Sequence, residues 1–112
     1  MATVQQDVII QQGATFQQLW ELQNKDLTSG YTFLAKFRAS HTAAAAVLTV
    51  TSFTVVKSGS HTHVTGTVSA LVTAALDAPA NGVYDLEATK TADGSVTREA
   101  EGSFYITPES TK

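Results

Sequence analysis

Apolar and polar residues alternate most regularly between residues 31 and 39. Polar side chains fill most of the positions between the apolar ones, with Leu34 as the exception. A repeat of two residues is typical of a β-strand that has one face in a core and the other near solvent. The pattern predicts a strand whose inward residues are Tyr31, Phe33, Ala35, Phe37 and Ala39.

A second alternating segment covers residues 82–108 and contains the dipeptide Asp93-Gly94 between two extended arms. An Asp-Gly pair between extended segments is a strong hairpin signal, because glycine adopts the positive φ that a tight turn needs. A long hairpin is not stable alone in water, so we expect it to pair with the 31–39 strand. Its apolar positions are Val83, Tyr84, Leu86, Ala88, Val96, Ala100, Phe104 and Ile106.

Four further segments are rich in β-branched or aromatic residues and are predicted to be strands: residues 4–12, 15–23, 47–56 and 61–69. The 47–56 strand is compatible with a bend near Ser52. The 15–23 segment fits a helical repeat as well as a strand repeat, and a strand is favoured because the segment is short, aromatic and preceded by glycine. Trp20 is then expected to pack in the core rather than to stack on a ligand.

One short helical turn is predicted near residues 70–76, with Ser69 as its N-cap and Leu71, Ala75 and Leu76 facing inward. Pro79 and Gly82 follow it and end it. The whole pattern comprises about seven short strands separated by turn signals, which indicates an all-β antiparallel sandwich or small barrel. We expect a single domain over residues 1–112, with 1–12 as an extended arm or edge strand and 108–112 as a frayed tail.

Composition narrows the classes of function. The 112 residues carry a net charge of −3, are 43% hydrophobic and only 15% charged, and include no cysteine. These values argue against a disordered chain, a basic nucleic-acid-binding surface and a thiolate metal site. The sequence shows neither a signal-peptide pattern nor an apolar run of about 18 residues, so we expect no membrane partner.

Two histidines are the candidates for a metal site. His61 and His63 lie two apart on a predicted strand and therefore share one face. His41 or a carboxylate could supply a third ligand, but nothing in the sequence indicates one. The favoured interpretation is two exposed histidines, so no metal and no cofactor is expected.

Acid–base catalysis has one candidate set, the carboxylates Asp85, Glu87, Glu99 and Glu101. Each pair shares a strand face, and the hairpin could bring the pairs together, which is one mark of an active site. Cationic residues are equally available as neighbours, so a solvated sheet face of mixed charge is favoured. No Gly-x-Ser-x-Gly or phosphate-binding loop occurs, and we expect no enzymatic activity. The cationic neighbours are Lys36, Arg38, Lys90 and Arg98.

Several motifs, in their order and spacing, resemble a family of small phage and prophage structural proteins. The N-terminal ones lie at residues 12–16, 26–32 and 36–38, and the C-terminal ones at 68–76, 82–87, 93–96 and 102–109. The likeness runs from about Gln11 to Glu109. Ser29 is one residue extra, and the alanines at 43–46 and the His-Thr-His at 61–63 depart from the family pattern.

The resemblance implies an immunoglobulin-like β-sandwich that docks other subunits of a virion and performs no chemistry. A place in the tail or baseplate is the first expectation, and a capsid decoration protein on the phage head is the alternative. The implied partners are other virion proteins, together with further copies of this chain in the particle, which is assembled in the host cytoplasm. A carbohydrate-binding module is less favoured because Tyr31, Tyr84 and Tyr105 all lie in core-like patterns.

The N-terminal segment contains the candidate partner-binding residues Val8, Ile9 and Ile10. This apolar run lies outside the clearest core pattern, so a neighbouring protein could cover it. The other interpretation is that the segment pairs within its own sandwich. The sequence favours neither.

Overall fold

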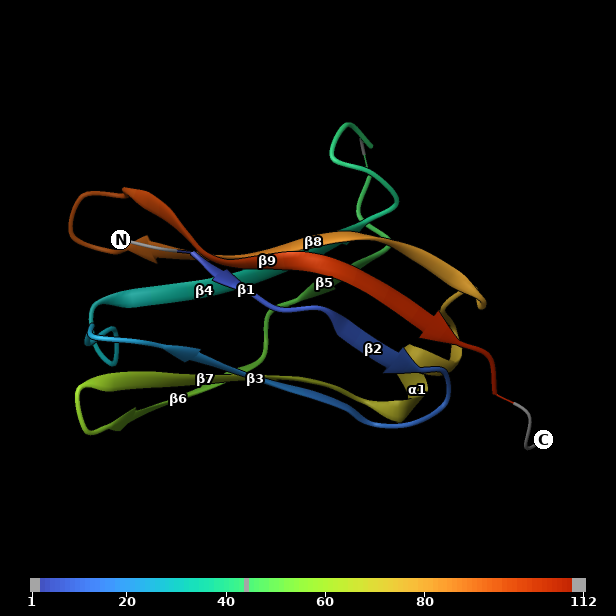
Figure 1. Ribbon diagram of the computed structural model, residues 1–112, viewed down its shortest axis with the longest axis horizontal. Coiled ribbons are helices and arrows are strands. Elements are labelled where there is room, and N and C mark those ends of the chain that lie inside the picture. Colours follow the sequence, from blue (N-terminus) through green and yellow to red (C-terminus); the bar gives the residue numbers. More distant parts are fainter. Residues whose placement is uncertain (1–2, 44, 110–112) are drawn as a thin grey trace.

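The computed structural model describes residues 3–43 and 45–109. These residues form nine strands and one short helix, whose order is shown in Figure 1. The elements are β1 (Val4–Gln5), β2 (Val8–Gln11), β3 (Phe16–Leu22), β4 (Tyr31–Arg38), β5 (Leu48–Val50), β6 (Phe53–Ser58), β7 (His61–Val68), α1 (Ala70–Ala74), β8 (Ala80–Lys90) and β9 (Val96–Thr107).

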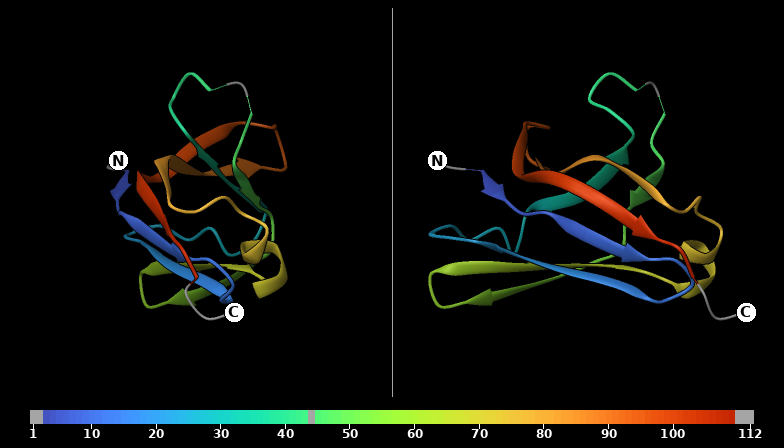
Figure 2. Two further views of the ribbon diagram at one scale, coloured as in Figure 1. Left: turned by 90° about the vertical axis from the view of Figure 1, so that its right-hand side faces the viewer. Right: turned by 45° about the vertical axis from the view of Figure 1, so that its right-hand side comes forward.

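The strands form two sheets that pack face to face (Figures 1 and 2). The larger sheet has the order β1-β9-β8-β4-β5, with β2 also on β9, and the smaller has the order β3-β7-β6. All neighbours are antiparallel except β1 and β2, which run parallel to β9. When the strands are lettered by their order along the chain, the sheet β9-β8-β4-β5 corresponds to the G-F-C-C′ sheet of an immunoglobulin domain. The sheet β3-β7-β6 then corresponds to strands B-E-D. The expected immunoglobulin-like β-sandwich is confirmed.

The core lies between the sheets and includes most of the residues that alternation predicted to face inward, but Ala39 and Val96 are exposed because they lie at the ends of their strands. Trp20 and Phe37 are the two largest fully buried side chains, with 1% and 0% of their surface exposed. The predicted pairing of the C-terminal hairpin with the 31–39 strand is confirmed, because β8 lies against β4 from Tyr31↔Lys90 to Arg38↔Val83.

The segment predicted as one strand over 47–56 is instead two strands in different sheets. β5 pairs with β4 in the larger sheet, whereas β6 pairs with β7 in the smaller one. The chain crosses between the layers at Thr51 and Ser52, where neither residue belongs to a strand. Both halves are β-branched and apolar, so their composition gives no sign of the crossing.

The hairpin turns at Asp93-Gly94 as expected, but its second arm differs from expectation. Residues 91–95 connect β8 to β9, with Gly94 at φ 74° and Asp93 Oδ1 accepting hydrogen bonds from Ser95. A β-bulge opposite Leu86 and Glu87 leaves Glu99 as an extra residue. The bulge turns Glu99 into the interior, where it is 4% exposed, so Glu99 does not share a face with Glu101 as predicted.

The predicted helical turn is present, and the Ser69 hydroxyl accepts a hydrogen bond from the Val72 amide. Of its three expected inward residues only Leu76 faces the core, whereas Leu71 and Ala75 are exposed. Thr73 is the buried one, Leu76 packs on the core, and Leu71 is 84% exposed. Within the described residues, no helix has the length and apolar character required to cross a bilayer.

Both ends of the described chain are tied to the sandwich. Val8 and Ile10 are buried, which makes residues 4–11 an edge strand rather than a free arm. At the other end, the Glu109 amide donates to Gln12 Oε1. The rest of the predicted tail, residues 110–112, lies outside the described residues.

Candidate functional site

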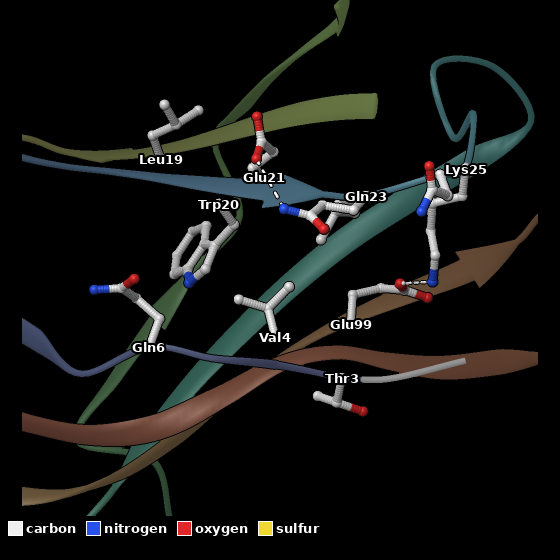
Figure 3. Close-up of a pocket in the computed structure, with 11 residues that line it drawn as sticks. Thr3, Val4, Gln6, Leu19, Trp20, Glu21, Gln23, Lys25 and Glu99 are labelled. Carbon is white, nitrogen blue, oxygen red and sulfur yellow. Dashed lines mark hydrogen bonds and ion pairs between the residues drawn. The ribbon is translucent and has the colours of Figure 1, made fainter. Parts of the chain in front are cut away.

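A groove of about 510 Å³ lies on one side of the sandwich, between β1 and β3 (Figure 3). It opens where the edge of one sheet faces the edge of the other. The residues lining it are Thr3, Val4, Gln6, Leu19, Trp20, Glu21, Leu22, Gln23, Asn24, Lys25 and Glu99. Apolar side chains from both sheets form its walls, and two charged residues lie together at one end.

The charged residues at that end are Lys25 and Glu99, whose Nζ and Oε1 atoms lie 2.6 Å apart. Their side chains are 17% and 5% exposed, so the pair is largely removed from water. Thr97 donates a further hydrogen bond to the second carboxylate oxygen. A buried charge needs such compensation. The ammonium and the carboxylate neutralise each other, and the groove gains little net charge from them.

Behind the groove, a chain of hydrogen bonds joins the two sheets. Trp20 Nε1 donates to the Tyr84 hydroxyl over 3.0 Å, and that hydroxyl donates to the Gln6 carbonyl. Burial raises the pKa of Tyr84 to about 12, against the smaller opposing effect of the hydrogen bond from Trp20. The phenol therefore stays protonated near neutral pH and acts as a structural donor rather than a base.

This aromatic pair stands where immunoglobulin domains of antibodies have a covalent link. Trp20 is on β3 and Tyr84 on β8, the equivalents of strands B and F, which a disulfide joins in those domains. The present chain has no cysteine. The rings pack with their centroids 6.0 Å apart, and the hydrogen bond fixes their relative orientation.

The two candidate metal-binding histidines share the outer face of β7, as predicted, but each has another partner. His63 Nε2 lies 3.0 Å from Glu21 Oε2, and His61 Nδ1 accepts a hydrogen bond from the Asn24 amide. His41 lies beside the larger sheet, near Glu101. In residues 3–43 and 45–109, no three histidine or carboxylate side chains gather in a metal-binding arrangement.

The four candidate carboxylates do not gather either. Asp85 and Glu101 are cross-strand neighbours, and Arg98 contacts both, at 3.6 Å and 3.2 Å. Hydrogen bonds from Gln5 and then the charge of Arg98 lower the pKa of Glu101. Glu99 points to the opposite side. This arrangement is the mixed-charge sheet face that the sequence favoured.

The three candidate partner-binding residues lie on opposite sides of β2. Val8 and Ile10 are 2% and 0% exposed, so they are unavailable to a partner, whereas Ile9 is 65% exposed. Ile9 lies directly beside Tyr105 of β9, which is 41% exposed. Successive side chains of a strand point to opposite faces. Assigning this segment to the sandwich would therefore have predicted that Ile9 faces away from the side that Val8 and Ile10 share.

The other two tyrosines of the carbohydrate hypothesis are less accessible. Tyr84 is 3% exposed, and Tyr31 packs against the core. Only Tyr105 among the three presents an exposed ring on the outer face of a sheet. A sugar-binding platform of several aromatic rings is not formed by these residues.

Three of the motifs that resemble phage structural proteins, at residues 12–16, 68–76 and 102–109, meet at one end of the sandwich. Gln12 donates to the Leu76 carbonyl over 2.7 Å and accepts from the Glu109 amide over 2.9 Å. The Gly13 amide donates to Thr73 Oγ1, which donates to the Ala14 carbonyl. Gly13 has a φ of 85°, and a Cβ there would lie 2.3 Å from the Glu109 carboxylate. These motif residues hold three distant segments together.

Comparison with known proteins adds little to this picture. No family model and no curated protein sequence matches the chain. A solved structure described as the NK cell receptor Nkp44, a triggering partner in natural cytotoxicity, is similar at 17% identity over 97% of this chain and 100% of that one, with a TM-score of 0.42. At that distance the likeness carries no functional inference, and the fold assignment rests on the strand order itself.

Proposed function

We propose that this chain is a non-catalytic docking module of a bacteriophage virion, placed in the tail or baseplate. The proposal rests on the ordered motifs that resemble phage structural proteins and on one surface feature, the exposed pair Ile9 and Tyr105. Three of these motifs meet at one end of the sandwich, where hydrogen bonds hold them together.

The surface feature that carries the proposal is a small apolar site on an edge strand. Ile9 and Tyr105 are neighbours on the outer face, 65% and 41% exposed. An aliphatic side chain beside a tyrosine suits a protein partner, because aromatic anchors dominate binding energy at interfaces.

The polar groups of the groove support a binding role rather than a chemical one. The Lys25 ammonium is held by Glu99, and the Tyr84 phenol is protonated and hydrogen-bonded on both sides. A general base needs an accessible group with a pKa near the working pH. The Tyr84 phenol, whose pKa burial raises to about 12, does not meet that requirement.

A capsid decoration protein is the second candidate, and the same surface serves it. Head and tail differ in symmetry, so the location in the particle separates the two. Immunogold electron microscopy of purified particles, with antibody against this chain, is the direct test. Label on the tail or its tip supports the proposal. Label over the head replaces it with the decoration role, and particles without label overturn both.

The docking surface is tested by the variant Ile9→Gln, with Val96→Gln as the matched control. Val96 is 55% exposed and lies at the other end of β9, so both changes remove a similarly exposed apolar side chain. We expect Ile9→Gln to reduce incorporation into particles by about tenfold. Equal incorporation of both variants would show that the docking site does not include Ile9 on β2.

A further inference from the structure

Strand β3 has a free edge along its whole length. It pairs with β7 over seven residues, from Phe16↔Val68 to Leu22↔Thr62, without a bulge. No described strand lies hydrogen-bonded on its other side. In an A-B-E-D sheet, strand A occupies that place. Here the N-terminal strands β1 and β2 pair with β9 instead, so the place beside β3 is vacant.

The backbone groups that face this vacancy belong to Gln17, Leu19 and Glu21. On β7, the Thr67 amide donates to Ser52 on the β6 side, so the odd-numbered residues of β7 face β6 and the even-numbered ones face β3. Even-numbered residues of β3 are their partners. The odd-numbered residues of β3 therefore turn outward. The Leu19 carbonyl accordingly accepts its hydrogen bond from the Gln18 side chain.

The other sheet edges each carry a feature that hinders pairing. β5 has only three residues, and β6 carries Lys57. The β1–β2 edge is interrupted at Gln6 and Asp7, where the chain leaves the ladder. Short strands, lysines and interruptions are the usual protections of edge strands. β3 has no lysine, proline or bulge, and its outer face presents Leu19, which is 51% exposed.

We propose that two copies of this chain pair through β3, antiparallel about a two-fold axis at Leu19, which joins their smaller sheets into one continuous sheet. Centring on Leu19 pairs all seven residues of β3 with those of the second copy. The outward-facing residues then form the hydrogen-bonded pairs of an antiparallel ladder. This inference concerns the isolated chain and stands without the virion role.

The side chains complement one another in this register. On the outer face, Leu19 meets Leu19 of the second copy, and each Gln17 lies opposite a Glu21. The glutamine amide donates and the carboxylate accepts, and this pair occurs twice by symmetry. Hydrogen bonding from His63 lowers the pKa of Glu21, which keeps the acceptor ionised. Centring on Glu21 instead would oppose two carboxylates.

Sedimentation equilibrium and residue-resolved hydrogen exchange test the pairing on the intact chain. We expect twice the mass of one chain as concentration rises. We also expect the Leu19 amide to become protected in parallel, whereas the Trp20 amide, which faces β7, stays protected throughout. A chain that remains a monomer at about 1 mM, the weak end of specific association, overturns the proposal. Dimers that leave the Leu19 amide exchanging freely overturn it as well.

Surface variants then test the face and the register. Leu19→Lys should abolish dimers, and Val56→Lys is its matched control, because Val56 is 53% exposed on the opposite edge strand. Gln17→Glu opposes two like charges and should weaken the dimer about tenfold, whereas Gln17→Lys should strengthen it. Gln17 is exposed, so neither change disturbs the monomer core. A reversed order of the two Gln17 variants excludes this register.

Discussion

At the scale of single residues, the Tyr84 hydroxyl is the polar group on which the connection between the two sheets most depends. It accepts from Trp20 Nε1 and donates to the Gln6 carbonyl, so it connects both sheets and the segment between β1 and β2. Its ring also stacks on Phe37 at a centroid distance of 5.0 Å. One phenol thus performs part of the cross-linking that a disulfide provides in other immunoglobulin-like domains.

We predict that Tyr84→Phe lowers the free energy of unfolding by about 1–3 kcal/mol, because it leaves a buried indole N–H and a carbonyl without a partner. Urea denaturation followed by tryptophan fluorescence measures the loss. Tyr105→Phe is the control, since the exposed Tyr105 side chain should cost under about 0.5 kcal/mol. Equal losses in the two variants would show that the Tyr84 hydroxyl contributes nothing specific.

Glu99 shows how a single inserted residue alters the chemistry of a strand. Period-two alternation put it beside Glu101 on a solvated face, but the bulge shifts it by one position into the groove. There it meets Lys25, a residue of a turn 74 positions away in the sequence. No local pattern encodes this encounter, because a bulge depends on the partner strand as much as on its own sequence.

At the scale of elements, two turns depend on aspartates that accept hydrogen bonds from the residue two positions on. Asp26 Oδ1 accepts from Thr28, and Asp93 Oδ1 from Ser95, through both amide and hydroxyl. These bonds lower the pKa of both aspartates below 3.8. The Asp-x-Ser/Thr spacing produces such Asx turns locally.

These pKa shifts predict the direction of the acid response. A carboxyl group with a lowered pKa in the folded state stabilises the fold above its unfolded pKa and loses that contribution as pH falls through the folded value. Stability should therefore decline below about pH 4. Asp93→Asn keeps the acceptor oxygen but cannot titrate, so its stability should vary less between about pH 2 and 5.

Melting temperature against pH, for wild type and Asp93→Asn side by side, measures the difference. Because the variant retains the turn geometry, the two proteins should have similar stability near neutral pH. Curves that stay parallel down to the lowest pH would mean that the Asp93 carboxylate has no part in the acid response.

At the scale of the whole molecule, the N-terminal strands close one side of the sandwich. β1 and β2 follow β9 in parallel, and Val8 and Ile10 fill the core beneath them. The sequence left open whether residues 4–12 are an arm for a partner or a strand of the domain. The structure assigns them to the domain, with Ile9 as their exposed apolar side chain.

Deleting residues 1–10 should therefore unfold the chain at 37 °C or lower its melting temperature sharply. Circular dichroism and heating curves measure this. Ile10→Ala, which opens a cavity in the core, should cost about 2–5 kcal/mol, whereas Ile9→Ala on the same strand should cost under about 0.5 kcal/mol. A truncated chain with an unchanged melting temperature would restore the free-arm interpretation.

The sequence by itself determined which side of most strands faces the core, because period-two alternation is a local property of each segment. It also determined the hairpin and the N-cap at Ser69, because the Asp-Gly pair and the serine before a helical segment are local signals. It did not reveal that residues 47–56 divide between two sheets, since both halves have the same composition.

Tertiary structure alone decided the neighbours of the N-terminal strands and of β3. The N-terminal strands join β9 and leave β3 with an open edge, and that choice is made by contacts between segments far apart in the chain. Alternation says which face of a strand is buried, but it carries no information about the partner on either edge, because backbone hydrogen bonding is the same for every residue except proline.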